Sequence, residues 1–472
     1  MRVAWSSSRS RALALCLLVA CGGTGGSSGA PQAPRGGVTL NVKLAHEHYR
    51  LANGLEVVLH RDPSLRNAIV DVRYDVGGKD DPPGRSGFAH LFEHLMFLGS
   101  KNVSELDFAQ VLDDAGAVSY NAFTTQDFTE YFEVVPPSQL PVALWIEADR
   151  MAHPIERVYP ETFARERDVV KNEWRERYDN VPYGHVGAII REALFPEGHP
   201  YCLPPIGRVE DLDRATVDDA KAFAARYYMP ANATLIVAGD IDIGETKKLV
   251  EARFASIPSP KERPRVRTFP FPRLTKDREV IVEADVEAAR VLVTWPIPPL
   301  HTRGWDEIHL AASTITSMTA YKVETKDKIA RNGGWDIIDG RLGSRLEISF
   351  ELEPRSANEW QSVVDSLETR VRWISDLADN GQEWSDFSDL RTQRMTRRVL
   401  SLADIEDRAT RMHEYLDCCG KPDDVQGELR RIQAVRPVDA AQATRDLLHA
   451  SGKLIVVVKP TKGAPRAGRV KP

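Results

Sequence analysis

The sequence is poor in cysteine, has no excess of basic residues, and has only a short apolar run at its N-terminus. Its 62 Lys and Arg residues are outnumbered by 68 Asp and Glu residues, which gives a net charge of −6. Nucleic-acid-binding domains usually carry a basic surface, so this balance argues against that class of function. The 472 residues exceed what one hydrophobic core accommodates, which predicts two or three domains.

The N-terminal segment is expected to be a targeting signal. Three arginines flank or precede an apolar run at 12–20, which is too short to span a bilayer. The run ends in Leu-Val-Ala-Cys, which resembles a bacterial lipobox with Cys21 as the lipidated first residue of the mature chain. An ordinary signal peptide cleaved nearby is the alternative. We therefore expect a signal peptide at 1–20, a flexible Gly/Ser linker at 21–40 and a periplasm-facing lipoprotein, with the outer membrane favoured.

Apart from Cys16 and Cys21, three cysteines remain, and their pairing is left open. Cys418 and Cys419 are adjacent, whereas Cys202 is distant from both in the sequence. A disulfide between Cys202 and either member of the pair is compatible with an oxidising compartment.

The stretch 88–97 carries the clearest chemical signal. On a helix, His90 and His94 lie one turn apart on the same face, so both imidazoles can reach one metal ion. Glu93 lies beside them, where a carboxylate can take a proton from a metal-bound water. The other residues are apolar, which indicates a buried helix, and buried polar side chains need partners. This His-x-x-Glu-His spacing is the inverted zinc-peptidase signature, expected by chance about 0.02 times in such a chain.

A zinc site needs a third protein ligand, and an acidic helix at 163–173 offers candidates. Glu166 and Glu173 are seven positions apart, two helical turns, so they share a face. A solvated, charged helix is the alternative, and the spacing by itself does not exclude it.

The second half of the chain is read as a diverged copy of the first. The strand patterns at 68–74 and 289–295 are separated by 289 − 68 = 221 positions, and two Val-Asp helix starts, at Val217 and Val438, are separated by 438 − 217 = 221. At this offset the metal residues correspond to Ala311, Thr314 and Ile315, so no metal site is expected in the copy.

These motifs together resemble the pitrilysin/insulin-degrading-enzyme family of inverted zinc metallopeptidases (inverzincins), in the short two-domain form of the mitochondrial processing peptidase subunits. The resemblance is specific over 45–245 and only architectural beyond. Further matching segments are Asn53-Gly54-Leu55, Asn121-Ala122-Phe123-Thr124 with Asp127 and Tyr131, His199-Pro200-Tyr201 with Ile206-Gly207, and Tyr228-Met229-Pro230-Ala231-Asn232.

The resemblance implies a role for each residue of the site. His90, His94 and Glu173 bind Zn²⁺, Glu93 is the general base, and Glu166 orients a ligand. Because 173 − 94 = 79 is slightly long for the family, Glu176 is kept as an alternative third ligand. The strand made of Asn121, Ala122, Phe123 and Thr124 would pair with an extended substrate, and an ordinary inner strand is the alternative.

The implied fold is α+β, with two homologous domains that each pack a mainly antiparallel sheet against helices. The expected boundaries are a catalytic domain at 41–257, a Pro-rich linker at 258–278, a domain without a metal site at 279–462 and a tail at 463–472.

The expected function is that of a zinc endopeptidase that hydrolyses unstructured peptides in a closed chamber, with zinc-bound water activated by Glu93. A non-catalytic binding or assembly subunit of a processing-peptidase-like complex is the alternative, and a zinc amidohydrolase has less support. The family builds its chamber from four such domains, so a homodimer or a heterodimer with a paralogous subunit lacking the zinc motif is implied. At the family's Arg/Tyr substrate-holding motif this chain has Tyr321 but no Arg at the expected spacing.

Overall fold

The computed structural model describes residues 41–260, 263–264, 269, 271–380 and 384–471. The expected signal peptide, the lipidated Cys21 and the linker at 21–40 lie outside the described residues. None of the described helices is both long and apolar enough to cross a lipid bilayer.

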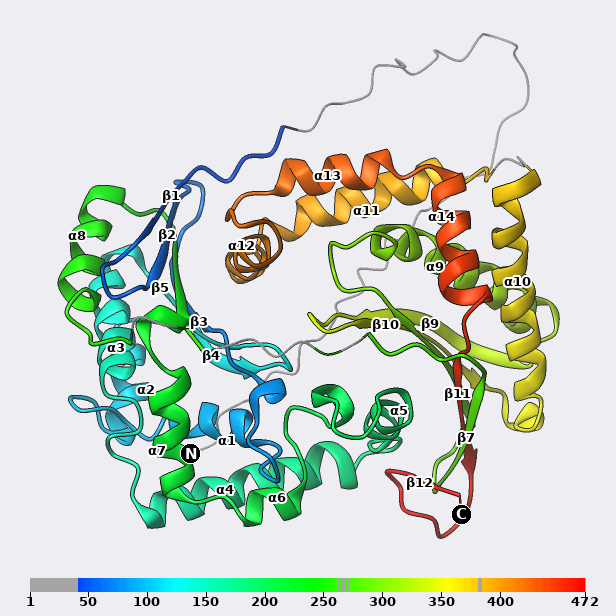
Figure 1. Cartoon of the computed structure of the whole chain (residues 1–472), viewed down its shortest axis with the longest axis horizontal. Coiled ribbons are helices and arrows are strands. Elements are labelled where there is room, and N and C mark those ends of the chain that lie inside the picture. Colours follow the sequence, from blue (N-terminus) through cyan, green and yellow to red (C-terminus); the bar gives the residue numbers. More distant parts are fainter. Residues whose placement is uncertain (1–40, 261–262, 265–268, 270, 381–383, 472) are drawn as a thin grey trace, which may run out of the picture. The chain divides into compact units, whose positions relative to one another are not determined.

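Two six-stranded sheets organise the described chain (Figure 1), and five of the six strands follow the same order in both. The sixth, at one edge, is the N-terminal β1 in the first sheet and the C-terminal β12 in the second. The first has the order β1-β2-β6-β3-β5-β4 and the second β12-β7-β11-β8-β10-β9. In each sheet one pair is parallel, β2 with β6 and β7 with β11, and all other pairs are antiparallel. The repeated order confirms the predicted α+β class and the duplication. The strands are β1 (His46–Arg50), β2 (Glu56–Arg61), β3 (Ala68–Tyr74), β4 (Ser119–Thr124), β5 (Thr129–Val135), β6 (Ala233–Gly239), β7 (Arg278–Ala284), β8 (Arg290–Ile297), β9 (Ala330–Ile338), β10 (Ser344–Leu352), β11 (Leu454–Pro460) and β12 (Arg469–Val470).

Helices cover both sheets. In the first half they are α1 (Phe88–Leu95), α2 (Glu105–Asp114), α3 (Leu140–Ala152), α4 (Pro160–Trp174), α5 (Val186–Leu194), α6 (Val209–Asp213), α7 (Val217–Tyr227) and α8 (Ile243–Phe254). In the second half they are α9 (Trp305–Ala320), α10 (Trp360–Asn380), α11 (Phe387–Ser401), α12 (Ile405–Cys419), α13 (Val425–Ala434) and α14 (Pro437–Thr444).

Each half of the chain provides a helix that packs on the sheet of the other half. Successive side chains of a strand point to opposite faces, so a sheet that is covered on both sides buries the side chains at every position. Val58 and Ile69 lie on the face of the first sheet that packs against Met412 of α12. The second sheet packs against α5 in the same way, through Ile190 and Val456. This exchange explains why β3 and β5 are buried along their whole length.

A buried ionic network also links the first sheet to α12. The imidazole of His413 lies 3.0 Å from Asp71, and both side chains are 1% exposed. Glu130 is paired with Arg73 at 2.5 Å and accepts a hydrogen bond from the Thr410 hydroxyl at 3.0 Å. Buried charges are costly unless they are paired and hydrogen-bonded, and these groups satisfy one another.

The structure also shows how the described cysteines are bonded and where the C-terminal segment lies. Cys418 and Cys419 are bonded to each other, and Cys202 is a free thiol, so the open question of a bond to Cys202 is answered in the negative. The segment at 463–472, expected as a tail, contributes β12 to the edge of the second sheet beside β7.

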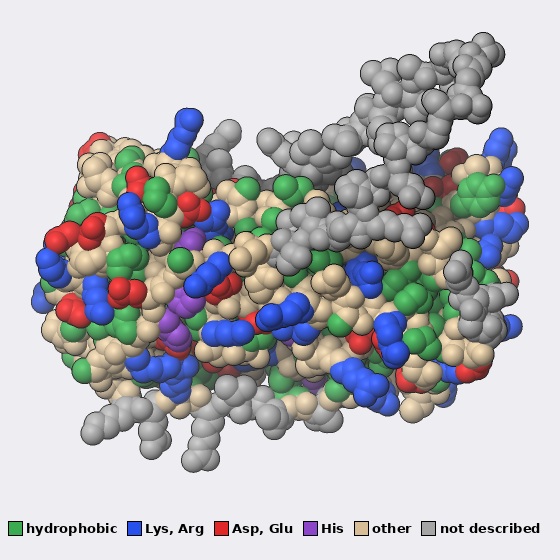
Figure 2. Space-filling model, turned by 90° about the horizontal axis from the view of Figure 1, so that it is seen from above, with side chains coloured by type: hydrophobic (Ala, Val, Ile, Leu, Met, Phe, Trp, Pro, Cys, Tyr) green, Lys and Arg blue, Asp and Glu red, His purple; other side chains and the backbone are tan. Residues whose placement is uncertain are grey.

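On the face seen in Figure 2, basic side chains are scattered among acidic, apolar and neutral ones.

Candidate metal centre

Contacts at the N-terminus of helix α1 fix the position of this helix. Asp81 accepts hydrogen bonds from the backbone N–H groups of Gly87, at 2.7 Å, and Ala89, at 2.8 Å, which satisfies donors that a helix start leaves free. Gly87 has a φ of 85°, and a Cβ there would lie 2.2 Å from the carbonyl oxygen of Ile206. Only glycine allows this backbone conformation together with this close approach. The apolar residues of α1 then pack into the core of the first half.

The two histidines of α1 meet one carboxylate of α4. His94 Nε2 lies 3.3 Å from Glu173 Oε2, and His90 Nε2 lies 3.7 Å from Glu173 Oε1. One ligand atom of each of the three residues lies within 4.8 Å of the others. In a tetrahedral zinc site with bonds of 2.0–2.1 Å, the ligand atoms are separated by about 3.4 Å. Two imidazole nitrogens and a carboxylate oxygen at these separations therefore fit a zinc ion.

The other two acidic candidates of this region have different surroundings. Glu166 Oε2 lies 3.6 Å from Nδ1 of His94, the ring nitrogen that does not face Glu173. This is the position from which a carboxylate orients a metal-binding imidazole. Glu176 is exposed, and the structure does not bring it into the cluster. Of the two third-ligand candidates, the structure brings Glu173 to the histidines.

Glu93 is buried beside the cluster and is held on one side only. Its Oε2 accepts a 2.5 Å hydrogen bond from the Thr124 hydroxyl, while its Oε1 is buried and has no hydrogen-bond partner among the described residues. Burial raises the pKa of Glu93 to about 7, although His94 and the Thr124 hydroxyl act in the opposite direction. A carboxylate with a pKa near neutrality is suited to accept and return a proton at physiological pH.

The two histidines differ in their electrostatic environment. Burial and the neighbouring His94 lower the pKa of His90 to about 3. Burial also acts to lower the pKa of His94, but the carboxylates of Glu166 and Glu173 outweigh it and raise this pKa to about 9. A cation at the centre would therefore compete with a proton on His94, because metal ligands must be deprotonated.

Strand β4 lies at the edge of the first sheet, next to α1. It pairs with β5 on one side only, for example through Asn121 and Phe132, and no strand among the described residues pairs with its other side. The segment Asn121, Ala122, Phe123 and Thr124 thus belongs to an edge strand and not to an inner one. Its last residue, Thr124, is the one that contacts Glu93.

Three contacts around the centre were not predicted from the sequence. These are the Asp81 contacts at the start of α1, the Thr124–Glu93 hydrogen bond, and the Arg177–Glu173 ion pair at 2.7 Å. The last could have been suspected from the i, i+4 spacing of opposite charges on one helix face.

The second copy carries no equivalent centre in the part of the chain that the structure describes. Helix α9 takes the place of α1, and its Ala311, Thr314 and Ile315 are buried and cannot form a three-ligand set. The other group of potential ligands, Asp71, Glu130 and His413, is the hydrogen-bonded network under α12. Tyr321, at the end of α9, is 56% exposed.

Comparison with known proteins places these features in a family. Residues 56–195 match the model of "Insulinase (Peptidase family M16)", and residues 214–319 match that of "Peptidase M16 inactive domain". The chain belongs to peptidase family M16. This confirms the resemblance to the insulin-degrading-enzyme family, and the inactive-domain match extends into α9 of the second half.

Several M16 relatives carry the description zinc protease. The chain is 35% identical over 213 residues to zinc protease PqqE of Helicobacter pylori, a match that covers 45% of this chain and 47% of that one. It is 27% identical over 419 residues to the uncharacterized zinc protease Rv2782c of Mycobacterium tuberculosis, with 86% and 91% covered. The first of these matches therefore spans about half the length of the relative.

Solved M16 structures share the two-domain fold. A protease from Helicobacter pylori superposes with a TM-score of 0.78 at 23% identity, covering 89% of this chain and 100% of that one. A peptidase M16 inactive domain from Pseudomonas fluorescens gives a TM-score of 0.76 at 14% identity, with 89% and 98% covered. At these identities the likeness describes the fold alone.

Proposed function

We propose that this protein is a zinc-dependent endopeptidase that hydrolyses unstructured peptides. The observation that carries the proposal is the convergence of His90, His94 and Glu173 beside the buried carboxylate of Glu93. Family M16 membership and relatives named zinc proteases support a peptidase at the family level. Two histidines and a carboxylate, with a fourth position left for water, are the ligand set of several catalytic zinc sites.

In this proposal each residue has a defined task. A zinc ion held by His90, His94 and Glu173 would polarise the scissile carbonyl and lower the pKa of water that it coordinates. Glu93 accepts the proton of the attacking water on Oε1, for which the described residues provide no hydrogen-bond partner, and returns it to the leaving amine. Thr124 fixes the other oxygen of Glu93, and Glu166 holds the ring of His94 in orientation.

The edge position of β4 supports extended peptides as the substrate class. A free strand edge offers backbone N–H and C=O groups that pair with any extended chain, whatever its side chains. A peptide bound along Asn121–Thr124 would lie next to Glu93, because Thr124 at the end of this segment contacts that carboxylate. Most backbone groups of a folded protein are already paired within it, so unstructured segments would be preferred.

The test is the substitution Glu93→Gln, which keeps the shape of the side chain and removes its basicity. Loss of a general base costs typically 10²–10⁴-fold in rate, so cleavage of a mixed peptide pool should fall by about this factor. Zinc content per chain, measured by elemental analysis, should stay at the wild-type value. Cleavage that survives the substitution would refute the role of Glu93.

The non-catalytic assembly subunit remains the second candidate, and the inactive-domain match over 214–319 is the observation in its favour. A scaffold has no need for a carboxylate poised beside two histidines. A wild-type protein that binds zinc but cleaves no peptide, alone or with a partner chain, would favour the scaffold.

We also propose a two-chain assembly, as a homodimer or with a paralogous subunit that lacks the zinc motif, anchored through Cys21 to a periplasm-facing membrane. The exposed side chain of Tyr321 and the absence of an Arg at the expected spacing support the need for a second chain. Full peptidase activity of a monodisperse, monomeric preparation would contradict this assembly.

A further inference from the structure

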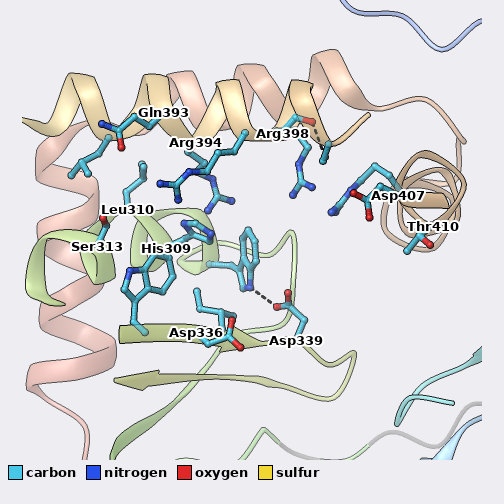
Figure 3. A pocket seen from close by; sticks show the side chains of 17 residues that line it. His309, Leu310, Ser313, Asp336, Asp339, Gln393, Arg394, Arg398, Asp407 and Thr410 are labelled. Carbon is cyan, nitrogen blue, oxygen red and sulfur yellow. Dashed lines mark hydrogen bonds between the residues drawn. The ribbon is translucent and has the colours of Figure 1, made fainter. Parts of the chain in front are cut away.

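A cavity of about 550 Å³ lies in the second half, between α9, β9 and the helices α11 and α12 (Figure 3). Its volume falls within the range of small-molecule and peptide side-chain sites, about 300–1,000 Å³. Trp305 and Trp335 contribute aromatic walls, and the exposed side chains of Gln393 and Arg397 form part of its rim. The cavity therefore opens to solvent and has an apolar surface inside.

A buried arginine with free donors points into this cavity. Arg394 reaches down from α11 toward His309 (Figure 3), and its side chain is 8% exposed. It donates one hydrogen bond, at 2.5 Å, to Asp306 and stacks over the ring of Trp305 at 4.8 Å. Its Nε and one terminal nitrogen are buried and have no hydrogen-bond partner in the described parts of the chain. Buried donors without partners are unfavourable, so an acceptor here would be strongly favoured.

The charges that line the cavity favour an anion with a single charge. The basic residues are Arg394, Arg397, Arg398 and Arg411, and the acidic ones are Asp336, Asp339 and Asp407. Arg394, Arg398 and Arg411 are already paired with the carboxylates of Asp306, Glu428 and Glu414. The cavity therefore has little excess positive charge, which suits a monoanion such as a carboxylate better than a doubly charged phosphate. Burial lowers the pKa of His309, assisted by the nearby arginines, so this imidazole adds no charge at neutral pH. Burial also lowers the pKa of Arg394 to about 10, which leaves it ionised at neutral pH.

The position of the cavity within the duplication is informative. Helix α9 and strand β9 are the counterparts of α1 and β4, the pair of elements that holds His90, Glu93 and Thr124 in the first half. The second copy thus presents a cavity on the same two elements, with an arginine from α11 in place of metal-binding side chains.

We propose that this cavity binds a carboxylate carried on an apolar or aromatic group. The free donors of Arg394 would hold the carboxylate, and the rings of Trp305 and Trp335 would contact the apolar part. The same chemistry is found at the C-terminal residue of a peptide and in a free aromatic acid. The site does not require peptide cleavage, so it stands or falls independently of the proposed function.

Isothermal titration calorimetry on the full chain tests the site. The probes are N-acetylphenylalanine, its amide, inorganic phosphate, and a ten-residue Gly/Ser peptide ending in phenylalanine as the acid and as the amide. The peptides are titrated into the Glu93→Gln protein so that they are not cut. Each acid should bind at least 10-fold more tightly than its amide, and more tightly than phosphate. A ten-residue acid that exceeds N-acetylphenylalanine identifies a peptide terminus as the source, and equal affinities identify the free acid.

Matched variants assign the binding to Arg394. The substitution Arg394→Gln should weaken acid binding by at least 10-fold, whereas Arg391→Gln, on the same helix but outside the cavity, should leave it unchanged. If Arg394→Gln fails to fold, Ser313→Phe keeps the arginine, fills part of the cavity and should abolish binding. Equal binding of acid and amide, no acid binding by the folded wild-type chain, or acid binding unaffected by both cavity variants would overturn the proposal.

Discussion

Thr124 and Glu93 are joined by a 2.5 Å hydrogen bond, in which the hydroxyl at the end of an edge strand fixes one oxygen of a buried carboxylate. This contact links the strand proposed to bind the substrate to the group proposed to move the proton. A peptide that pairs with β4 would therefore lie against a residue that already holds the base in position.

Replacing Thr124 tests that link. The substitution Thr124→Val keeps the shape of the side chain and removes the hydroxyl, and a hydrogen bond to a charged group contributes about 1.5–3 kcal/mol. We expect kcat for peptide cleavage to fall about 10- to 100-fold, with zinc content unchanged. Thr124→Ser retains the hydroxyl and should restore most of the rate. Equal rates for the Val and Ser variants would show that the contact has no role in catalysis.

The identity of the third zinc ligand is decided by a pair of matched substitutions on one helical segment. Glu173→Gln should reduce zinc content per chain to a small fraction of the wild-type value, because the amide is a poor ligand beside His90 and His94. Glu176→Gln changes the same chemistry on an exposed residue and should leave zinc content intact. The reverse result would assign the ligand to Glu176.

Removal of the metal should lower thermal stability. The three ligand residues come from α1 and α4 and meet only in the folded chain, so an ion bound there stabilises the native state. At a free zinc concentration 1,000 times the Kd this contribution is about 4 kcal/mol. A chelator should therefore lower the thermal midpoint of the wild-type protein and leave that of Glu173→Gln nearly unchanged. Equal shifts in both proteins would indicate that the stabilising metal binds elsewhere.

Asp81 is expected to position α1. The substitution Asp81→Ala removes the acceptor of two backbone hydrogen bonds at the helix start and should cost about 1–2 kcal/mol of stability. We expect a lower thermal midpoint together with weaker zinc binding, since His90 and His94 depend on the placement of α1. Asp218→Ala, in the exposed first turn of α7, is the control and should change neither quantity.

The buried His413 gives a prediction on pH and stability. Burial, assisted by the guanidinium of Arg73, lowers the pKa of His413 to about 3, from 6.5 for a free imidazole. As the pH falls below about 6.5, the unfolded chain binds a proton that the folded chain does not, so this contribution to stability is complete above pH 6.5 and is lost toward pH 3. Burial raises the pKa of Asp71 to about 7, which acts in the opposite direction, with stability lost as the pH rises from about 4 through 7.

The variant His413→Gln separates the histidine from the aspartate. Between pH 6 and 4 its free energy of unfolding should fall less steeply than that of the wild type, by up to about 1.4 kcal/mol per pH unit. His449→Gln, at an exposed position, serves as the control and should follow the wild-type curve. Parallel curves for all three proteins would contradict a lowered pKa for His413.

Much of the site could be read from the sequence because it is local. His90, Glu93 and His94 lie within one and a half helical turns, and the strand pattern at 68–74 was predicted with the bounds that the structure gives to β3. The duplication was visible because its two halves keep the same strand pattern at one offset. The acidic helix predicted at 163–173 lies within α4, which begins at Pro160, ends at Trp174 and passes into a π-helical turn, Arg175–Asp179.

Features that depend on packing between distant segments could not be predicted. No sequence pattern showed whether the expected substrate strand is an edge strand or an interior strand. The difference depends on which strands pair with β4, and this is unknown until the sheet is assembled. The donors of Arg394 became apparent only once α11 was placed over α9, since its partners Trp305 and Asp306 are almost 90 residues away in the chain. In the same way, nothing in the pattern of α12 indicated that it would cover the sheet of the other half.

Because α5 packs on the second sheet and α12 on the first, the two halves would stay associated after the chain between them is cut. A protease that cuts the connection between α8 and β7 would leave a nicked protein that still migrates as one particle in gel filtration. Either fragment expressed alone would expose a hydrophobic sheet face, such as the one formed by Val58, Ile69 and Ile236. Such a fragment would aggregate rather than refold.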